Sequence, residues 1–368
     1  MYRFKLKRFW LLLSVPLSCL LIFIARSRPA LAEAYAKGLY YRLSLLINKA
    51  SGYAPLSVSE ILVYIAAVFI IYYIIHNIIK IIKGRSDRGE TAVKFIGNIA
   101  CAAGLLLLAY TLNCGINYYR YTFAETCGLS VKPSSEAELK ELCSSLQKDV
   151  NTSREKVSSG DGSVMKLSGK SIYVTAEKAR ASYDKLQKNY PLLHAGYGPT
   201  KPVYFSKLMS YANITGMFFP FTFEANVNTD APDYTIPATM CHELSHLRGY
   251  MREDEANFIG YLACMESTDS DFRYSGNMLA FTYASNALYS ADSAAAKKIS
   301  GGLSSGVKRD LAYNSAYWKK FEGPVADVSQ NVNDRYLKAN SQDDGVKSYG
   351  RMVDLLLARQ RALKQTKK

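Results

Sequence analysis

The sequence predicts three N-terminal transmembrane helices, followed by a mainly α soluble domain of the α+β class with a small antiparallel sheet. Three observations support this fold class. Three long apolar runs lie near the N-terminus, helical periodicity dominates the remainder, and one short stretch rich in Tyr, Phe and Val is punctuated by Gly and Pro. We therefore divide the chain into a membrane anchor, residues 1–118, and a soluble domain, residues 119–368.

The apolar runs cover about residues 9–25, 61–82 and 95–116. The second and third reach the ~20 residues needed to cross a hydrocarbon core, and the first is marginal. The first run could instead be a cleaved signal peptide, because basic residues precede it and Ala30-Leu31-Ala32 follows, although Arg26 and Arg28 disfavour cleavage. The third run has a small-residue face suited to helix packing in lipid, formed by Gly97, Cys101 and Gly104.

Lysine and arginine cluster in the N-terminal tail and in the loop between the second and third runs. Both regions are therefore expected in the cytoplasm, which predicts a multi-pass protein of the cell membrane with an extracytoplasmic soluble domain. Residues 1–94 hold 14 Lys and Arg against 4 Asp and Glu, whereas the remaining 274 residues hold 32 against 27. Because the positive charge is concentrated near the membrane, the expected partner is the lipid bilayer and not nucleic acid. Between the first two runs, Leu39–Ile47 is amphipathic and is expected to lie at the membrane interface.

The soluble domain is expected to be helical except between Pro202 and Asn228, where short strands are predicted. Helices are predicted over Glu136–Val157, Ile172–Tyr190, Asp271–Tyr289, Ser293–Lys298, Ser305–Phe321, Val325–Lys338 and Val346–Leu363. Phe219–Asn228 is predicted either as an edge strand, along which an extended peptide could lie, or as a core strand. On the edge-strand interpretation, the candidate substrate contacts are Phe221, Phe223, Ala225 and Asn226.

The segment His242-Glu243-Leu244-Ser245-His246 has the HExxH pattern, and it contains two of the four histidines in the chain. Helix positions four apart share a face, so His242 and His246 can offer two imidazole nitrogens to one metal ion. Glu243 lies about 100° around the helix, where it can reach a metal-bound water. The pattern is typical of zinc hydrolases in which the glutamate acts as the general base.

A catalytic zinc site needs a third protein ligand, so the chain has to turn back after His246. Gly249 stands where a helix C-cap glycine would be placed, and the acidic residues after Arg252 are typical of the first turn of a second helix. Glu253 is the favoured third ligand and Glu255 the alternative, because the two point in different directions on a regular helix. Asn257 shares a face with Glu253 and is a candidate to orient a ligand. Small residues on this helix would allow close packing, namely Ala256, Gly260, Ala263 and Cys264.

The HELSH and EDEAN motifs resemble those of the glutamate-zincin metallopeptidases, whose third ligand lies in an ExxxD- or ExxAN-type segment. More closely, residues 242–264 resemble a family of uncharacterised bacterial membrane-anchored proteins, the domain of unknown function 3810 family, which are predicted to be zinc peptidases. The resemblance takes in 219–228, 333–338 and 345–349, and so extends over most of the chain. It implies a zincin-like soluble domain and one zinc ion per chain, held by His242, His246 and Glu253, with Glu243 as general base.

Other polar residues carry weaker indications. Tyr283, Arg273 and Tyr349 are candidates to stabilise an oxyanion by residue type alone. His194 follows Pro191 in a turn-like stretch, which favours a structural role. Cys127 and Cys143 would be able to pair outside the cell, but their spacing leaves both the paired and the unpaired state open.

These observations predict a membrane-anchored zinc metallopeptidase that acts on a peptide or protein substrate, which could be linked to the cell envelope. The alternative is a non-enzymatic membrane sensor or cell-envelope scaffold that retains a zinc site. Because a purely structural site needs no general base, Glu243 favours the enzyme.

Overall fold

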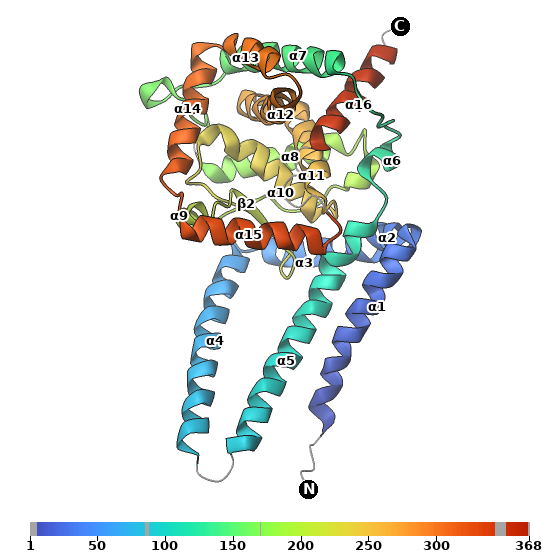
Figure 1. The fold of residues 1–368 in the computed structure, drawn as a ribbon, viewed down its shortest axis with the longest axis vertical. Coiled ribbons are helices and arrows are strands. Elements are labelled where there is room, and N and C mark those ends of the chain that lie inside the picture. Colours follow the sequence, from blue (N-terminus) through green and yellow to red (C-terminus); the bar gives the residue numbers. More distant parts are fainter. Residues whose placement is uncertain (1–5, 85–87, 170, 343–350, 367–368) are drawn as a thin grey trace.

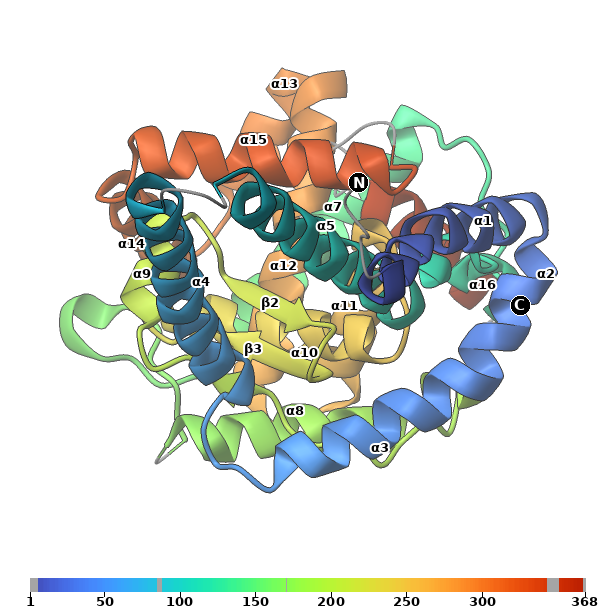
Figure 2. The ribbon, with the colours of Figure 1, turned by 90° about the horizontal axis from the view of Figure 1, so that it is seen from below.

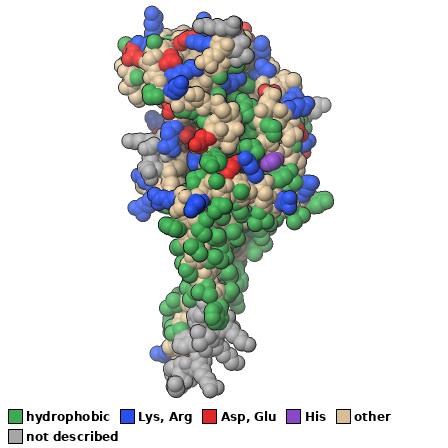
Figure 3. Space-filling view, turned by 90° about the vertical axis from the view of Figure 1, so that its right-hand side faces the viewer, with side chains coloured by type: hydrophobic (Ala, Val, Ile, Leu, Met, Phe, Trp, Pro, Cys, Tyr) green, Lys and Arg blue, Asp and Glu red, His purple; other side chains and the backbone are tan. Residues whose placement is uncertain are grey.

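The computed structural model describes residues 6–84, 88–169, 171–342 and 351–366. Three helical segments near the N-terminus are long and apolar enough to cross a membrane, namely Trp10–Ser27, which includes α1 (Ser14–Ser27), and the helices α4 (Val58–Lys83) and α5 (Arg88–Asn113). They form a stem below a globular part (Figure 1), and hydrophobic side chains cover this stem (Figure 3). The three predicted apolar helices are confirmed, although the third begins two turns earlier than expected.

The stem is held together partly by close packing of α1 on α5. A β-carbon at Gly104 would lie 2.6 Å from Ser14 Oγ, so the two helices approach as only a glycine allows. Cys101 and Gly104 are both buried, which confirms the predicted small-residue face at these positions. Asn98 on α5 donates to the hydroxyl of Tyr73 on α4 at 3.0 Å. A leading 3-10 segment, Leu6–Leu13, precedes α1.

Between α1 and α4 the chain lies across the top of the stem, as α2 (Pro29–Tyr35), a π-helical turn (Ala36–Tyr40) and α3 (Tyr41–Gly52). Figure 2 shows this segment, which we call the in-plane segment (residues 28–57), curving around one side of the molecule when it is seen from below. Tyr40 is 1% exposed and belongs to the main hydrophobic core. The core of the globular part therefore includes residues that precede two of the three membrane helices.

The small sheet has the strand order β1-β3-β2, with β1 (Lys201–Pro202), β2 (Gly216–Phe219) and β3 (Glu224–Val227). β1 pairs with β3 in parallel and β2 pairs with β3 antiparallel, so the predicted all-antiparallel sheet is wrong and the sheet is mixed. The edge-strand interpretation of Phe219–Asn228 is also wrong. β3 is the middle strand and all four of its residues are buried, whereas the edge on that side is β2.

Most of the globular part is helical, as predicted. Its helices are α6 (Phe123–Cys127), α7 (Glu136–Arg154), α8 (Ile172–Leu186), α9 (Ser206–Tyr211), α10 (Ile236–Leu247), α11 (Glu253–Glu266), α12 (Ser270–Ala291), α13 (Ser293–Gly301), α14 (Ser305–Lys319), α15 (Pro324–Ala339) and α16 (Met352–Thr366); short 3-10 turns cover Gly115–Tyr119, Asp161–Ser163, Pro191–Leu193 and Asp233–Thr235. Two differences stand out: α9 lies where strands were expected, and α8 ends four residues before the predicted Tyr190. The expected start of the last helix, Val346, lies outside the described residues.

The helix α10 runs through the middle of the globular part. It packs against α11, α8 and α12 and against β2 and β3. In Figure 1, α12, α7 and α13 lie above α10 and α11, on the side away from the stem. This places the HExxH segment between a helical layer and the sheet, close to the stem.

Candidate metal centre

The local sequence explains how α10 begins and ends. Pro237 stands in its first turn, where its missing N–H is not needed. After Leu247 the chain turns through Gly249, whose φ is +83°, and the N–H groups of Gly249 and Tyr250 donate back to the carbonyls of His246 (2.8 Å) and Ser245 (3.2 Å). This pattern is a Schellman motif, so the glycine predicted to end the helix does so.

Three donor atoms converge at this end of α10. His242 Nε2 lies 3.0 Å from His246 Nε2, and Glu253 Oε2 lies 3.2 Å from His242 Nε2 and 3.7 Å from His246 Nε2. The three side chains are about nine-tenths buried. They form a group that could hold one metal ion.

Hydrogen bonds orient both imidazole rings so that their Nε2 atoms face the centre. His242 Nδ1 lies 2.9 Å from the amide oxygen of Asn257, and His246 Nδ1 lies 2.8 Å from the backbone carbonyl of Tyr250. Because both partners are acceptors, each Nδ1 carries a proton, so a neutral ring at either position offers an unprotonated Nε2 to a metal ion. Two imidazole lone pairs and a carboxylate within 3.7 Å of one another repel unless a proton or a metal ion lies between them.

The two candidate third ligands point in different directions. Glu253 is the first residue of α11 and its carboxylate faces the histidines. Glu255 instead accepts from the backbone N–H of Phe123 at 2.7 Å and from Arg252 at 3.2 Å. The structure thus brings Glu253 into the centre and directs Glu255 to the start of α6.

Close packing of α11 on α10 delivers Glu253 to the histidines. A β-carbon at Gly260 would lie 3.0 Å from the backbone nitrogen of His242 and 3.2 Å from its Cα. Ala256, Ala263 and Cys264 are fully buried along the same helix. The predicted small-residue contact between the two helices is therefore confirmed.

Glu243 is buried against the edge strand. A β-carbon at Gly216 of β2 would lie 2.5 Å from Glu243 Oε1, so only glycine leaves room for the carboxylate there. Burial raises the pKa of Glu243, which the two histidines and a hydrogen bond from the Phe218 backbone N–H partly offset. A carboxylate with a raised pKa beside the three converging donors is suited to accept a proton at neutral pH.

The charges of the centre are strongly coupled. Burial alone would lower the pKa of His246, but the carboxylates of Glu253 and Glu243 raise it to about 9. Burial would raise the pKa of Glu253, yet the two histidines hold it well below its ordinary value. Both shifts follow from the attraction between a carboxylate and a positive charge at the histidines, and a metal ion would supply the same attraction.

Of the three candidates to stabilise an oxyanion, the structure places one beside the centre. Tyr283 lies near the centre, because its hydroxyl accepts from Asn257 at 3.3 Å and the Glu253 carboxylate helps burial to raise its pKa to about 12. Arg273 is exposed and donates to the Ser267 carbonyl beyond the end of α11, and Tyr349 lies outside the described residues.

The remaining histidine and cysteine candidates lie away from the centre. The ring of His194 stacks on that of Tyr41, with ring centres 3.9 Å apart, in keeping with a structural role. Cys127 and Cys143 do not form a disulfide with each other.

Of the four candidate substrate contacts, only Phe221 reaches the surface, with 36% of it exposed. Phe223 is fully buried among aromatic residues, and Ala225 is 1% exposed. Asn226 is also buried, and its amide oxygen accepts from Ser57 Oγ at 2.7 Å. β3 therefore joins the sheet to the start of α4, and β2 is the strand whose outer edge lies beside Glu243.

Comparison with known proteins adds one finding. A family model described as a protein of unknown function (DUF3810) matches residues 35–357, which is most of the chain. The chain belongs to this family. No curated protein and no solved structure shows a significant match. The matched span begins within the in-plane segment and includes α4 and α5, so it covers two of the candidate membrane helices as well as the candidate metal centre.

Several residues that support the centre in this DUF3810 protein carried no sequence signal. Glu33 and Arg120 form a buried, two-pronged ion pair with both N···O distances at 2.9 Å. The Arg120 guanidinium also lies 4.3 Å from the ring centre of Tyr250, whose carbonyl holds His246. Tyr40 donates to the last carbonyls of α10. A single acidic or aromatic residue far from the HExxH motif can be assigned a supporting role only when the folded structure shows its contacts.

Proposed function

We propose that this protein is a membrane-anchored zinc metallopeptidase. The observation that carries the proposal is the convergence of three donor atoms, with separations of 3.0, 3.2 and 3.7 Å. In a tetrahedral zinc site with bonds of about 2.0–2.2 Å, donor atoms lie about 3.3–3.6 Å apart, a range that the three separations bracket. Two imidazoles and one carboxylate also match the ligand set of zinc hydrolases that keep one position open.

Each residue of the centre has a role in this proposal. His242, His246 and Glu253 would hold the metal, and Asn257 and the Tyr250 carbonyl orient the two rings. A bound zinc ion would supply Lewis acidity toward a carbonyl oxygen and lower the pKa of water. Glu243 takes a proton from the attacking water and gives it to the leaving amine, which its raised pKa favours.

A peptide substrate would lie along β2 in this proposal. β2 is the last strand of the sheet in the order β1-β3-β2, and its Gly216 and Phe218 contact Glu243. An extended chain can add to such an edge by backbone hydrogen bonds, with its scissile bond next to the metal centre. This interpretation replaces β3 with β2 as the substrate strand and retains Phe221 as a surface contact. Tyr283 is the candidate donor to the oxyanion, because its hydroxyl lies beside the centre.

The topology is proposed from charge. Lys80 and Lys83 end α4, and Arg88 and Lys94 lie in the first turns of α5, which favours the cytoplasm for that end of the stem. The globular part would then be extracytoplasmic in the cell membrane. A membrane-impermeant amine label that reaches Lys298 in intact cells would support this orientation, whereas labelling only after lysis would reverse it.

The test uses full-length protein in detergent micelles, in the wild type and in Glu243→Gln. We expect one zinc per chain in both proteins, and hydrolysis of a fluorogenic peptide library only in the wild type, because Glu243 is not a ligand. A wild-type protein that binds zinc without hydrolysing any peptide would favour the sensor or scaffold alternative. Full activity in Glu243→Gln would refute the role of the glutamate as base.

A further inference from the structure

The metal centre lies directly against the ends of the membrane helices. Cys114 follows the last residue of α5, and its thiol lies 3.6 Å from the sulfur of Met251, two residues before Glu253. Tyr40 of the in-plane segment donates to the carbonyls of His246 and Leu247 at the end of α10. The end of α10 and the loop that leads into α11 therefore contact residues at the boundary between stem and globular part.

The sheet is fastened to the stem in the same way. The buried carboxylate of Glu224 accepts from the backbone N–H groups of Ser59 (2.7 Å) and Val58 (3.2 Å), the first residues of α4. Ile61, the first large apolar side chain exposed on α4, follows Val58 by three residues, or about 5 Å along the helix. The strands beside the centre are thus about one helical turn from the lipid-exposed part of the stem.

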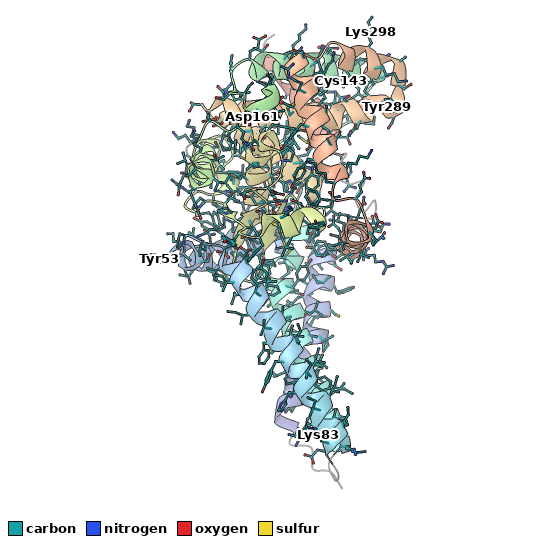
Figure 4. The ribbon with its side chains drawn as sticks, turned by 90° about the vertical axis from the view of Figure 1, so that its left-hand side faces the viewer. Tyr53, Lys83, Cys143, Asp161, Tyr289 and Lys298 are labelled. Atoms are coloured by element: carbon teal, nitrogen blue, oxygen red, sulfur yellow. The ribbon has the colours of Figure 1, made fainter. Side chains whose placement is uncertain are left out.

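The face of the globular part around the stem is rich in exposed apolar side chains. We call this face the base; α3, α9 and α15 lie at its level in Figure 1 and surround the β2–β3 hairpin in the view from below (Figure 2). Tyr53, 91% exposed, lies at the height where α4 begins (Figure 4). Exposed apolar residues on these elements include Leu46 of α3, Leu208 of α9, and Val325, Val328 and Val332 of α15.

The helix α15 buries little of its surface against the rest of the protein and leaves an apolar stripe exposed. Leu337 is the only buried one of its 16 residues, whereas Val325, Val328 and Val332 form a stripe that is more than 60% exposed. A helix of this length with so little packing is marginal in water. Lipid suits this stripe because the base is continuous with the hydrophobic stem, and Lys and Arg side chains gather where the two meet (Figure 3).

A lipid-facing base restricts how a substrate can reach the centre. The side away from the stem is covered by α12, α7 and α13 (Figure 1). The turn that joins β2 to β3 brings Phe219 and Phe221 together, with ring centres 5.3 Å apart, at the base. A chain that extends along β2 would therefore enter from the level of the lipid surface.

We propose that the substrate is a polypeptide anchored in the same membrane and cut at a bond next to the lipid surface. This inference rests on the peptidase activity proposed above. Anchoring places the scissile bond at the height of the centre, whereas a bond far from the membrane would have to be drawn down to it. The base would hold the enzyme at this fixed height.

The test uses the full-length protein in liposomes. A peptide that the enzyme cuts in detergent is fused to a transmembrane anchor through a flexible spacer of about 5 or about 30 residues, which spans about 12 or about 30 Å on average. Both substrates have the same surface density, so only the height of the cleavage site differs. We expect the short spacer to be cut at least about tenfold faster, more than the few-fold dilution that a longer tether causes.

A soluble protease of broad specificity is the control, because its access from water should favour the long spacer. Equal or faster cleavage of the long spacer by the membrane enzyme would overturn the inference while leaving the peptidase proposal intact. Absence of cleavage of any peptide in detergent would instead contradict the peptidase itself.

A second measurement tests the base without any activity. Tryptophan is introduced by Val328→Trp on α15 or by Tyr289→Trp, at a position that Figure 4 places far from the stem. Both positions are more than half exposed, so the two variants are matched. Lipids with brominated acyl chains should quench the added fluorescence of Val328→Trp and not that of Tyr289→Trp. Equal quenching in the two variants would show that the base does not touch lipid.

Discussion

Tyr40 and His246, 206 positions apart in the chain, are joined by a hydrogen bond of 3.3 Å from the tyrosine hydroxyl to the histidine backbone carbonyl. The same hydroxyl lies 3.2 Å from the carbonyl of Leu247. The last carbonyls of a helix lack partners within the helix. The His246 carbonyl also accepts from the Gly249 N–H, so Tyr40 matters most for the Leu247 carbonyl. The in-plane segment thereby fixes the end of the helix that carries both candidate histidine ligands.

We expect Tyr40→Phe to lower the free energy of unfolding by about 1 kcal/mol, because it removes the hydroxyl that donates to the Leu247 carbonyl. Thermal unfolding of the full-length protein in detergent would measure the loss. Tyr53→Phe is the matched control, since that ring is 91% exposed in the same segment. Equal stability of the two variants would show that the hydroxyl of Tyr40 contributes nothing.

The two acidic residues at the start of α11 should differ sharply in metal binding. Glu253→Ala removes a donor atom and is expected to abolish stoichiometric zinc binding, measured by native mass spectrometry of the full-length protein. Glu255→Ala should keep the zinc but lose about 1–3 kcal/mol of stability, because the Phe123 N–H loses its acceptor. Loss of zinc in Glu255→Ala, with retention in Glu253→Ala, would show that Glu255 and not Glu253 is the third metal ligand.

The close approach at Gly216 predicts a variant that separates metal binding from catalysis. A β-carbon there would lie within 2.8 Å of three atoms of Glu243 and Thr239, so Gly216→Ala has to displace the Glu243 carboxylate. We expect zinc to be retained and kcat/KM to fall by at least about tenfold, as for other displaced catalytic groups. Gly301→Ala is the control, because no atom lies within 4 Å of its β-carbon. Unchanged kcat/KM in Gly216→Ala would mean that Glu243 has room to move.

The buried pair of Glu33 and Arg120 predicts a pH dependence of stability. Burial alone would raise the pKa of Glu33, but the hydrogen bonds and charge of Arg120 bring it below its ordinary value of 4.5. The unfolded chain therefore takes up this proton at higher pH than the folded protein does. The stabilisation is fully present above pH 4.5 and is lost as the pH falls through the folded-state pKa.

Glu33→Gln should accordingly be less stable than the wild type by about 3 kcal/mol at pH 7, since it leaves the Arg120 charge buried and unpaired. The difference should shrink toward zero as the pH falls below 4.5. Denaturant unfolding of both proteins with a metal chelator present removes any contribution from zinc. A difference that stays constant with pH would show that the ion pair is not its source.

A fragment that begins at Tyr119 should fail to fold cooperatively, although it contains every candidate ligand. It lacks Tyr40, and also Asn48, whose side-chain amide donates to the Phe223 carbonyl at 2.7 Å. It also lacks the start of α4, whose first N–H groups donate to the Glu224 carboxylate. We expect co-expression with residues 1–118 to restore zinc binding, measured on the purified pair. A fragment that binds zinc on its own would contradict the structural role of the in-plane segment.

The sequence predicted those parts of the molecule that depend on local spacing. The shared face of His242 and His246 follows from helical periodicity, and the turn at Gly249 follows from the left-handed conformation that glycine adopts without strain. The three candidate membrane helices were predicted because the length of an apolar run is also a local property of the sequence. Which of Glu253 and Glu255 faces the histidines depends on the residue at which α11 begins. The acidic first turn indicated that start only to within a few residues, so Glu255 stayed an alternative.

The sequence missed the features that depend on distant contacts. β1 has two residues and no periodic signal, so its parallel pairing with β3 could not be anticipated. β3 lies in the segment 219–228, for which an edge strand was one of the two predictions. Its polar residues are instead buried by partners at the start of α4, such as Ser57 for Asn226. Whether a polar side chain faces water or a partner is decided by residues more than a hundred positions away.

The capping of α4 by the Glu224 carboxylate also affects the order in which the protein can fold during its synthesis. Residues 28–59 leave the ribosome long before β3, α10 and α11 are synthesised. Their contacts with these later elements can therefore form only after those elements have been made. The contacts that hold the sheet and the end of α10 can form only when these early segments are already in place. The candidate metal centre would therefore be completed late in synthesis, next to a stem that is already made.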